Sequence, residues 1–324
     1  MCFQFTAEEI RQRKFTKRGL SLNVLLVGEN GTGKKTFINT LSNRNYFNTI
    51  SETVDHSGNG GKLEISEHTI IIDPNAIPIK LNVFITENFG FNLENSSNAT
   101  TLIKYIENEY DRILKHERLI ERTHNPIDKR IHVALYFIIP TGKGLNDFDI
   151  ENMKKLGQRV NLIPVISKSD GLTEEELRLN KDLINKAIFE NNIEVFNFTN
   201  DEEDSFPGEE DESEDNIFMK TLQEKIPFAV IGANSVTDEG HQVRTNSFAV
   251  IDVNDETNCD YKLLRNVLLG SHIEEFKDTT NNGKYEDYRV QSLTFNPNEI
   301  NKLPQLKIYN ALREEERRNF SNIL

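Results

Sequence analysis

The chain has 324 residues, of which 36% are hydrophobic and 28% charged, so it can form one large domain with extensions or two small domains. Its two cysteines, Cys2 and Cys259, are too few for a disulfide framework or a zinc site, and no apolar run reaches the roughly 18–20 residues that cross a bilayer. The opening residues resemble neither a secretory signal nor a transit peptide, so we expect a soluble intracellular protein. We also expect no nucleic-acid partner.

The first twenty residues carry a cluster of basic side chains, and we interpret 1–20 as a basic N-terminal arm. Such a cluster beside a folded domain can attract anionic membrane lipid or an acidic protein, although a solvated arm has the same composition. The candidate membrane-binding residues are Arg11, Arg13, Lys14, Lys17 and Arg18.

A strand, a glycine-rich loop and a helix follow the arm. The apolar run over 22–27 predicts the strand, and a helix is expected from Lys34 to about Leu41. The loop between them, GENGTGKK from Gly28 to Lys35, fits the pattern G-x-x-x-x-G-K. In that pattern backbone N–H groups cradle phosphates, the lysine reaches the β- and γ-phosphates, and the helix N-terminus favours an anion.

The position after the loop lysine departs from the pattern. A serine or threonine hydroxyl should bind Mg²⁺ there, but the residue is Lys35, with Thr36 one place later. One helical step turns a side chain by about 100°, so Thr36 cannot simply replace the missing hydroxyl. A second cation should also repel Mg²⁺, which makes bound Mg²⁺ doubtful.

Further strands and helices alternate along the chain. We expect helices over 100–122, 147–157 and 174–190, the last with Thr173 as N-cap, and strands over 68–73, 79–85, 132–139, 162–167 and 227–232. Most of these strands are apolar throughout. The fold class is therefore α/β, with a doubly wound, mostly parallel sheet and helices on both faces.

The segment Ser167-Lys168-Ser169-Asp170 follows one buried strand. Guanine-specific GTPases carry N-K-x-D or a related sequence in that place, where the aspartate can accept two hydrogen bonds from guanine. Taken alone the pattern also fits a surface turn, but its order after a phosphate loop favours a base-recognition motif.

Ten acidic residues without an intervening basic one occupy one short stretch, which supplies most of the net charge of −14. They are Asp201, Glu202, Glu203, Asp204, Glu209, Glu210, Asp211, Glu212, Glu214 and Asp215. We expect 200–216 to be a disordered loop, and 291–324 to be a polar tail whose short helical segment is too short for a coiled coil. His132 and His272 are interpreted as packed structural histidines, and no histidines have metal-ligand spacing.

Several blocks resemble the septin family. They include FINTL after the phosphate loop, the run from Arg130 to Leu177, IPFAVIGAN at 226–234, and CDYKLLRNVLLGSHIEEFKD with YEDYR at 259–289. The last block is similar to the septin unique element, which other small GTPases lack. The resemblance covers about 11–290 and implies a P-loop GTPase-like domain over 21–290 with a septin-type C-terminal extension. The details most resemble a fungal filament-end subunit or its sporulation-type paralogue.

The resemblance implies bound GTP or GDP and assembly with other septin subunits into filaments. It assigns nucleotide binding to Gly28, Asn30, Gly31, Thr32, Gly33, Lys34, Lys35, Thr36, Lys168, Asp170, Gly232 and Arg244, and a contact across the nucleotide-side interface to Lys143. It also implies a cytoplasmic, cytoskeletal protein associated with membranes at a septin ring, bud neck or prospore membrane.

The D-T-P-G motif of the family has been lost here. It reads Ile85-Thr86-Glu87-Asn88, so the aspartate that holds a magnesium-bound water is isoleucine, and the glycine whose N–H meets the γ-phosphate is asparagine. Phosphoryl transfer depends on positioning and on charge neutralisation by the metal, so we predict a pseudo-GTPase with no catalytic residue. Two possibilities remain open. Either the Lys35 ammonium replaces the metal charge and the nucleotide binds without Mg²⁺, or the site is empty and Lys35 pairs with Glu87.

Two other functions remain to be weighed against a structural subunit. An active GTPase switch would keep the phosphate loop and base motif but needs the missing metal ligands. A lipid-anchored scaffold acting through the basic arm is compatible with a filament subunit.

Overall fold

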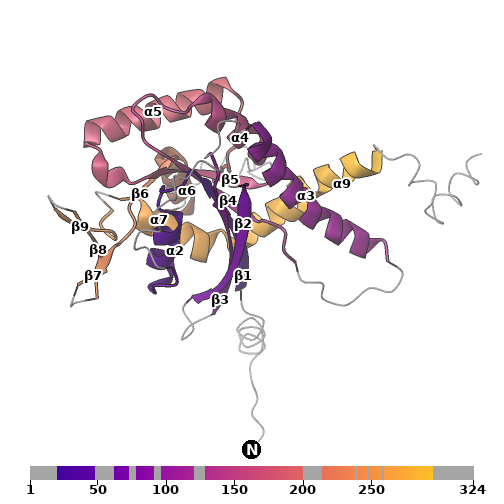
Figure 1. The fold of residues 1–324 in the computed structure, drawn as a ribbon, viewed down its shortest axis with the longest axis horizontal. Helices are drawn as coiled ribbons and strands as arrows, with labels where there is room; N and C mark the ends of the chain where they lie inside the picture. Colours follow the sequence, from indigo (N-terminus) through magenta and orange to yellow (C-terminus); the bar gives the residue numbers. More distant parts are fainter. Residues whose placement is uncertain are drawn as a thin grey trace, which may run out of the picture.

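The computed structural model describes residues 20–47, 62–72, 78–90, 96–119, 128–199, 214–237, 240–246, 249–256 and 259–294. Its centre is a six-stranded sheet in the order β2-β3-β1-β4-β5-β6 (Figure 1). The strands are β1 (Leu20–Gly28), β2 (Glu64–Ile72), β3 (Ile79–Glu87), β4 (Val133–Ile138), β5 (Asn161–Ser167) and β6 (Phe228–Val230). Only β2 runs antiparallel to its neighbour in this sheet, which confirms the predicted mostly parallel arrangement.

Helices cover both faces of the sheet, because its central strands are apolar on both sides. One core contains side chains of α2 (Lys34–Ser42), α6 (Glu214–Lys225), α7 (Tyr261–Asn266) and α8 (Ile273–Asp278). The other contains side chains of α3 (Ser96–Glu117), α4 (Asp147–Gly157), α5 (Glu174–Glu190) and α9 (Tyr285–Thr294). No helix among the described residues combines the length and apolar character needed to span a membrane.

Some element bounds differ from the sequence expectations. β2 begins four residues earlier than predicted because it pairs with β3 along its whole length, from Glu64 opposite Glu87 to Ile72 opposite Ile79. α3 spans Ser96–Glu117 instead of 100–122, and α6 begins at Glu214, inside the range predicted as an acidic loop. Residues 200–213, the N-terminal arm before Leu20 and the tail after Thr294 lie outside the described residues, so the predicted domain boundaries stay predictions.

A second, smaller sheet was not predicted. It contains β7 (Ser235–Val236), β8 (Gln242–Thr245) and β9 (Val250–Asp252), all antiparallel. Gln242 donates hydrogen bonds from Nε2 to the carbonyl of Thr40 (2.8 Å) and to Oδ1 of Asn43 (3.1 Å), which ties this sheet to the end of α2. The segment after β6 is therefore held beside the helix that follows the phosphate loop.

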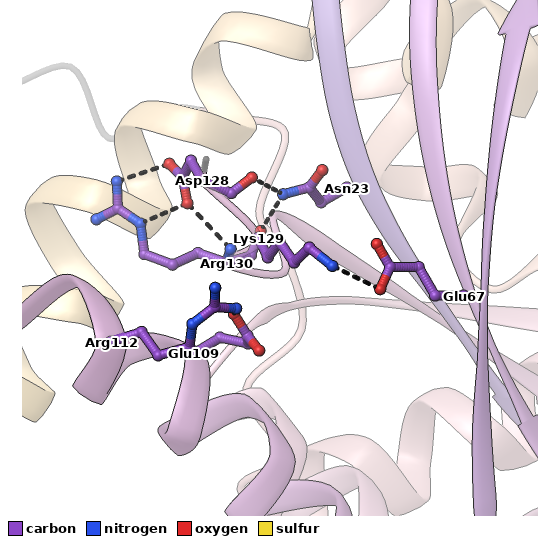
Figure 2. Close-up of polar contacts among 7 residues, drawn as sticks. All are labelled: Asn23, Glu67, Glu109, Arg112, Asp128, Lys129 and Arg130. Carbon is purple, nitrogen blue, oxygen red and sulfur yellow. Dashed lines mark hydrogen bonds and ion pairs between the residues drawn. The ribbon is translucent and has the colours of Figure 1, made fainter. Parts of the chain in front are cut away.

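A polar network joins the strands at the end of the sheet opposite the phosphate loop (Figure 2). Buried Asn23 donates from Nδ2 to the carbonyls of Asp128 (3.1 Å) and Arg130 (2.7 Å). Arg130 pairs with both carboxylate oxygens of Asp128 at 3.0 and 2.8 Å, and its guanidinium lies 4.9 Å from the ring centroid of Tyr285. The network thus connects the sheet to α9 and to the C-terminal part of the domain.

Candidate functional site

The candidate site lies where the parallel strands end. β1 ends at Gly28, β3 at Glu87, β5 at Ser167 and β6 at Val230, and parallel neighbours bring these ends to one edge of the sheet. Ligands of open α/β sheets bind in the crevice beyond the carboxyl ends of the strands. The sequence-predicted residues of the phosphate loop and of the base motif are therefore brought to the same edge.

The phosphate loop has an open backbone cradle. Gly31 (φ 82°) and Gly33 (φ 88°) adopt left-handed conformations, and a Cβ atom added to either would meet no atom within 4 Å. Thr32 closes the turn by donating its hydroxyl to the carbonyl of Glu29 at 2.9 Å. α2 begins directly after Gly33, so its first N–H groups face the same space. The loop therefore fits the phosphates of a nucleotide.

The Lys34 ammonium is buried within the loop and donates hydrogen bonds to the carbonyl oxygens of Gly28 and Glu29. Desolvation lowers the pKa of Lys34 to about 7, and the nearby Lys35 acts in the same direction, while Glu87 and Glu29 partly oppose the shift. A phosphate beside this side chain would favour its charged form.

Lys35 and Glu87 form an ion pair, with 3.3 Å between Nζ and Oε1 and about a third of each side chain exposed. This pair joins the start of α2 to the end of β3. Two residues earlier in β3, Ile85 is buried in the core, and Thr86 donates its hydroxyl to the carbonyl of Leu26 (3.1 Å). The side chains at the two expected magnesium contacts are thus an ammonium and an aliphatic group.

Asn30 and Asn88 form a second link between the same two segments. The backbone N–H of Asn88 donates to Oδ1 of Asn30 at 3.2 Å, and Nδ2 of Asn30 donates to Oδ1 of Asn88 at 3.4 Å. Asn88 has a φ of 59°, the left-handed region that glycine favours and asparagine tolerates best among the other residues. Asn88 therefore adopts a backbone conformation that suits glycine best, and its N–H is bonded within the protein.

The residues at this edge do not fit a magnesium ion. Magnesium prefers oxygen ligands in a near-octahedral arrangement. Where the family pattern supplies a hydroxyl and a carboxylate, this chain has Lys35 and the buried Ile85. Across the part of the chain that the structure describes, no group of three or more His, Cys, Asp or Glu side chains could hold a metal ion.

The base end of the site centres on Asp170, which lies in a short helical turn after β5. Lys168 adopts a left-handed conformation (φ 52°) and is exposed. Oδ2 of Asp170 accepts a hydrogen bond from Nδ2 of Asn246 at 2.7 Å and lies 3.6 Å from Nε of Arg244 on β8. Arg244 thus lies beside the base motif. Asn246 was not predicted, and no spacing or motif in the sequence marks it.

The remaining predicted residues divide between the site and the surface. The methyl group of Thr36 faces Gly232, where an added Cβ would come within 2.8 Å of it, so Gly232 allows the loop after β6 to approach α2. Lys143 is exposed in the loop after β4. The five basic residues predicted to bind membranes lie outside the described residues.

The chain is similar to members of a known protein family over most of its length. The family model described as Septin matches residues 18–302. Cell division control protein 11 of Saccharomyces cerevisiae is 38% identical over 293 residues, which cover 88% of this chain and 69% of the relative. Sporulation-regulated protein 28 of the same yeast is 34% identical over 354 residues, covering 98% of this chain and 82% of the relative.

The fold has a solved counterpart. The crystal structure of Cdc11 from Saccharomyces cerevisiae aligns with a TM-score of 0.55 and 33% sequence identity, covering 84% of this chain and all of that chain. The family match spans both the phosphate-loop domain and the extension through α9. The chain therefore belongs to the septin family of cytoskeletal, GTPase-like proteins.

Proposed function

We propose that this chain is a septin filament subunit that assembles with other septins and does not hydrolyse GTP. The observation that carries the second part is the 3.3 Å ion pair between Lys35 and Glu87, because Lys35 stands where the phosphate-loop pattern has a metal-binding hydroxyl. Phosphoryl transfer without a metal lacks its main source of charge neutralisation. The likeness to a cell division protein and a sporulation-regulated protein supports a role in division or spore formation.

Co-purification tests the assembly. The full-length chain is co-expressed with the other septins of its organism, and the complex is examined by size-exclusion chromatography and electron microscopy at low salt. We expect stoichiometric incorporation into rods and filaments. A chain that stays monomeric while the other septins assemble without it would contradict the proposal.

Membrane association would follow from the basic arm. We expect liposomes with anionic lipid to pellet the protein, and neutral substitution of Arg11, Arg13, Lys14, Lys17 and Arg18 to abolish the pelleting. Unchanged pelleting of the neutralised variant excludes this arm as the anchor.

An active GTPase switch remains the second candidate function. The open glycine cradle, the buried Lys34 and the placement of Asp170 favour nucleotide binding in either case. Hydrolysis separates the two candidates, since a subunit without metal ligands should bind a nucleotide without turning it over.

Nucleotide affinity should fall as the pH rises above about 7. Lys34 loses its charge in that range in the free protein, and phosphate contact requires the ammonium, so binding must take up a proton. We expect the affinity to drop by up to about tenfold per pH unit above that pKa. Calorimetry in buffers of different ionisation enthalpy measures the proton uptake. Lys34→Arg, which stays charged, should show no such pH dependence.

Replacement of Asn246 by alanine should strengthen guanine-nucleotide binding. The Asn246 amide holds the Asp170 carboxylate at 2.7 Å and must leave it before guanine can bond there. Losing one partly buried competing hydrogen bond should raise the affinity by roughly threefold to tenfold. Titration with a fluorescent GDP analogue measures the change, and Asn254→Ala on the neighbouring turn serves as a control. A weaker affinity in the Asn246 variant would show that this amide supports the base instead.

A further inference from the structure

We infer that the site is selective for a nucleoside diphosphate over a triphosphate and binds it without a metal ion. The inference deepens the proposed function and rests on the guanine-nucleotide site described there. It follows from two side-chain links, Asn30 with Asn88 and Lys35 with Glu87, which close the terminal-phosphate end of the site.

The first link removes the backbone donor that a terminal phosphate would use. In the family pattern the N–H after the third strand meets the γ-phosphate, and here that N–H belongs to Asn88 and donates to Oδ1 of Asn30. The reciprocal amide contact at 3.4 Å fixes the Asn30 side chain across the gap between loop and strand end. A γ-phosphate can reach this donor only if the Asn30 side chain is displaced.

The second link neutralises the extra ammonium at this end of the site. Glu87 places a carboxylate beside the start of α2, where its ion pair with Lys35 offsets the positive charge of that ammonium. Glu29 adds a second carboxylate that acts on Lys34. A triphosphate brings more negative charge to this end than a diphosphate does, without a metal ion to offset it. The carboxylate of Glu87 therefore disfavours the triphosphate specifically.

The inner part of the cradle is not affected by these contacts. Gly31 and Gly33 leave open space in front of their backbone, and the buried Lys34 ammonium contacts the carbonyls of Gly28 and Glu29 in the same loop. Backbone donors and one ammonium are sufficient ligands for a diphosphate. The base end remains available through Asp170 once Asn246 releases it.

Binding of GDP and GTP to the full-length protein, freed of any co-purified nucleotide, tests the inference. Titrations are made with excess EDTA and with excess Mg²⁺. We expect GDP to bind at least about tenfold more tightly than GTP, and we expect Mg²⁺ to change the GDP affinity less than about twofold. Asn88→Gly and Glu87→Gln should each raise GTP affinity and leave GDP affinity nearly unchanged.

Two matched variants control for nonspecific effects. Asn192→Gly replaces another left-handed asparagine (φ 50°) away from the loop, and Glu67→Gln replaces a similarly exposed carboxylate that pairs with Lys129 at 2.7 Å. Both should keep the wild-type ratio of GDP to GTP affinity. Equal or tighter binding of GTP, a strong requirement for Mg²⁺, or binding of neither nucleotide would each overturn the inference. Filament assembly by a chain that binds neither nucleotide would leave the proposed subunit function intact.

Discussion

Replacement of Asn161 by alanine is expected to lower the free energy of unfolding by about 3 kcal/mol, because it leaves buried polar groups without their partner. Asn161 is buried at the start of β5. Its Nδ2 donates to the carbonyls of His132 (2.8 Å) and Phe276 (3.0 Å) and lies 3.2 Å from Oγ1 of Thr280. One side chain of β5 therefore joins the residue that precedes β4 to the septin-type extension.

Chemical denaturation measures the Asn161 effect. Thr280 donates its hydroxyl to the same two carbonyls, at 3.3 Å to His132 and 2.7 Å to Phe276. The double variant Asn161→Ala with Thr280→Val should therefore deviate from additivity. Exposed Asn254→Ala should change stability by less than about 0.5 kcal/mol. If Asn161→Ala lowers the unfolding free energy no more than Asn254→Ala does, Asn161 does not link the extension to the sheet.

The free energy of unfolding should also decrease as the pH falls from 6.5 to about 4, because His132 is buried in its neutral form. Burial lowers the pKa of His132 from 6.5 to about 4, Lys277 and Arg130 add to the shift, and Asp128 opposes it. Nδ1 of His132 accepts the N–H of Asn23 at 3.0 Å, and protonation would remove that acceptor. Because the unfolded histidine takes up a proton first, the stabilisation is complete above pH 6.5, and about 3 kcal/mol is lost by pH 4.

The variant His132→Asn isolates this effect, since its Oδ1 can accept the same N–H without titrating. Asp149 has a pKa raised to about 6, chiefly by burial, and contributes a pH dependence of opposite sign. That contribution is present in both proteins and cancels in the difference between their unfolding free energies. Exposed His241→Asn serves as a control. Parallel pH profiles for wild type and His132→Asn would contradict the prediction.

The sequence predicted the central sheet well because its signals are local. Apolar runs such as the one from Leu22 to Val27, followed by glycine or a polar turn, mark buried parallel strands, and the phosphate loop marks the end of β1. The three-stranded antiparallel sheet was missed because β7 has two residues and β9 three, too short for an alternating pattern. The π-helical segments at Val267–Ser271 and Thr279–Lys284 have no sequence signal either.

The candidate site was predicted only where its residues belong to a contiguous motif. Lys34 and Asp170 were predicted because each belongs to a short motif that follows a strand. The Asn30–Asn88 contact joins residues 58 positions apart, and Asn246 reaches Asp170 from 76 positions away. Contacts of that kind depend on the relative placement of whole elements. The Lys35–Glu87 pair was one of two possibilities from the sequence, and it is present in the structure.

Single-turnover hydrolysis of GTP labelled at the γ-phosphate, by the chain in complex with its partner septins and with excess Mg²⁺, tests the central claim most directly. The partner sites are silenced by substitution so that only this chain could act. We expect the phosphate released by the wild-type chain to equal that released by a Lys34→Ala chain. Clear turnover that disappears on Lys34→Ala would contradict the account and show that this septin hydrolyses GTP.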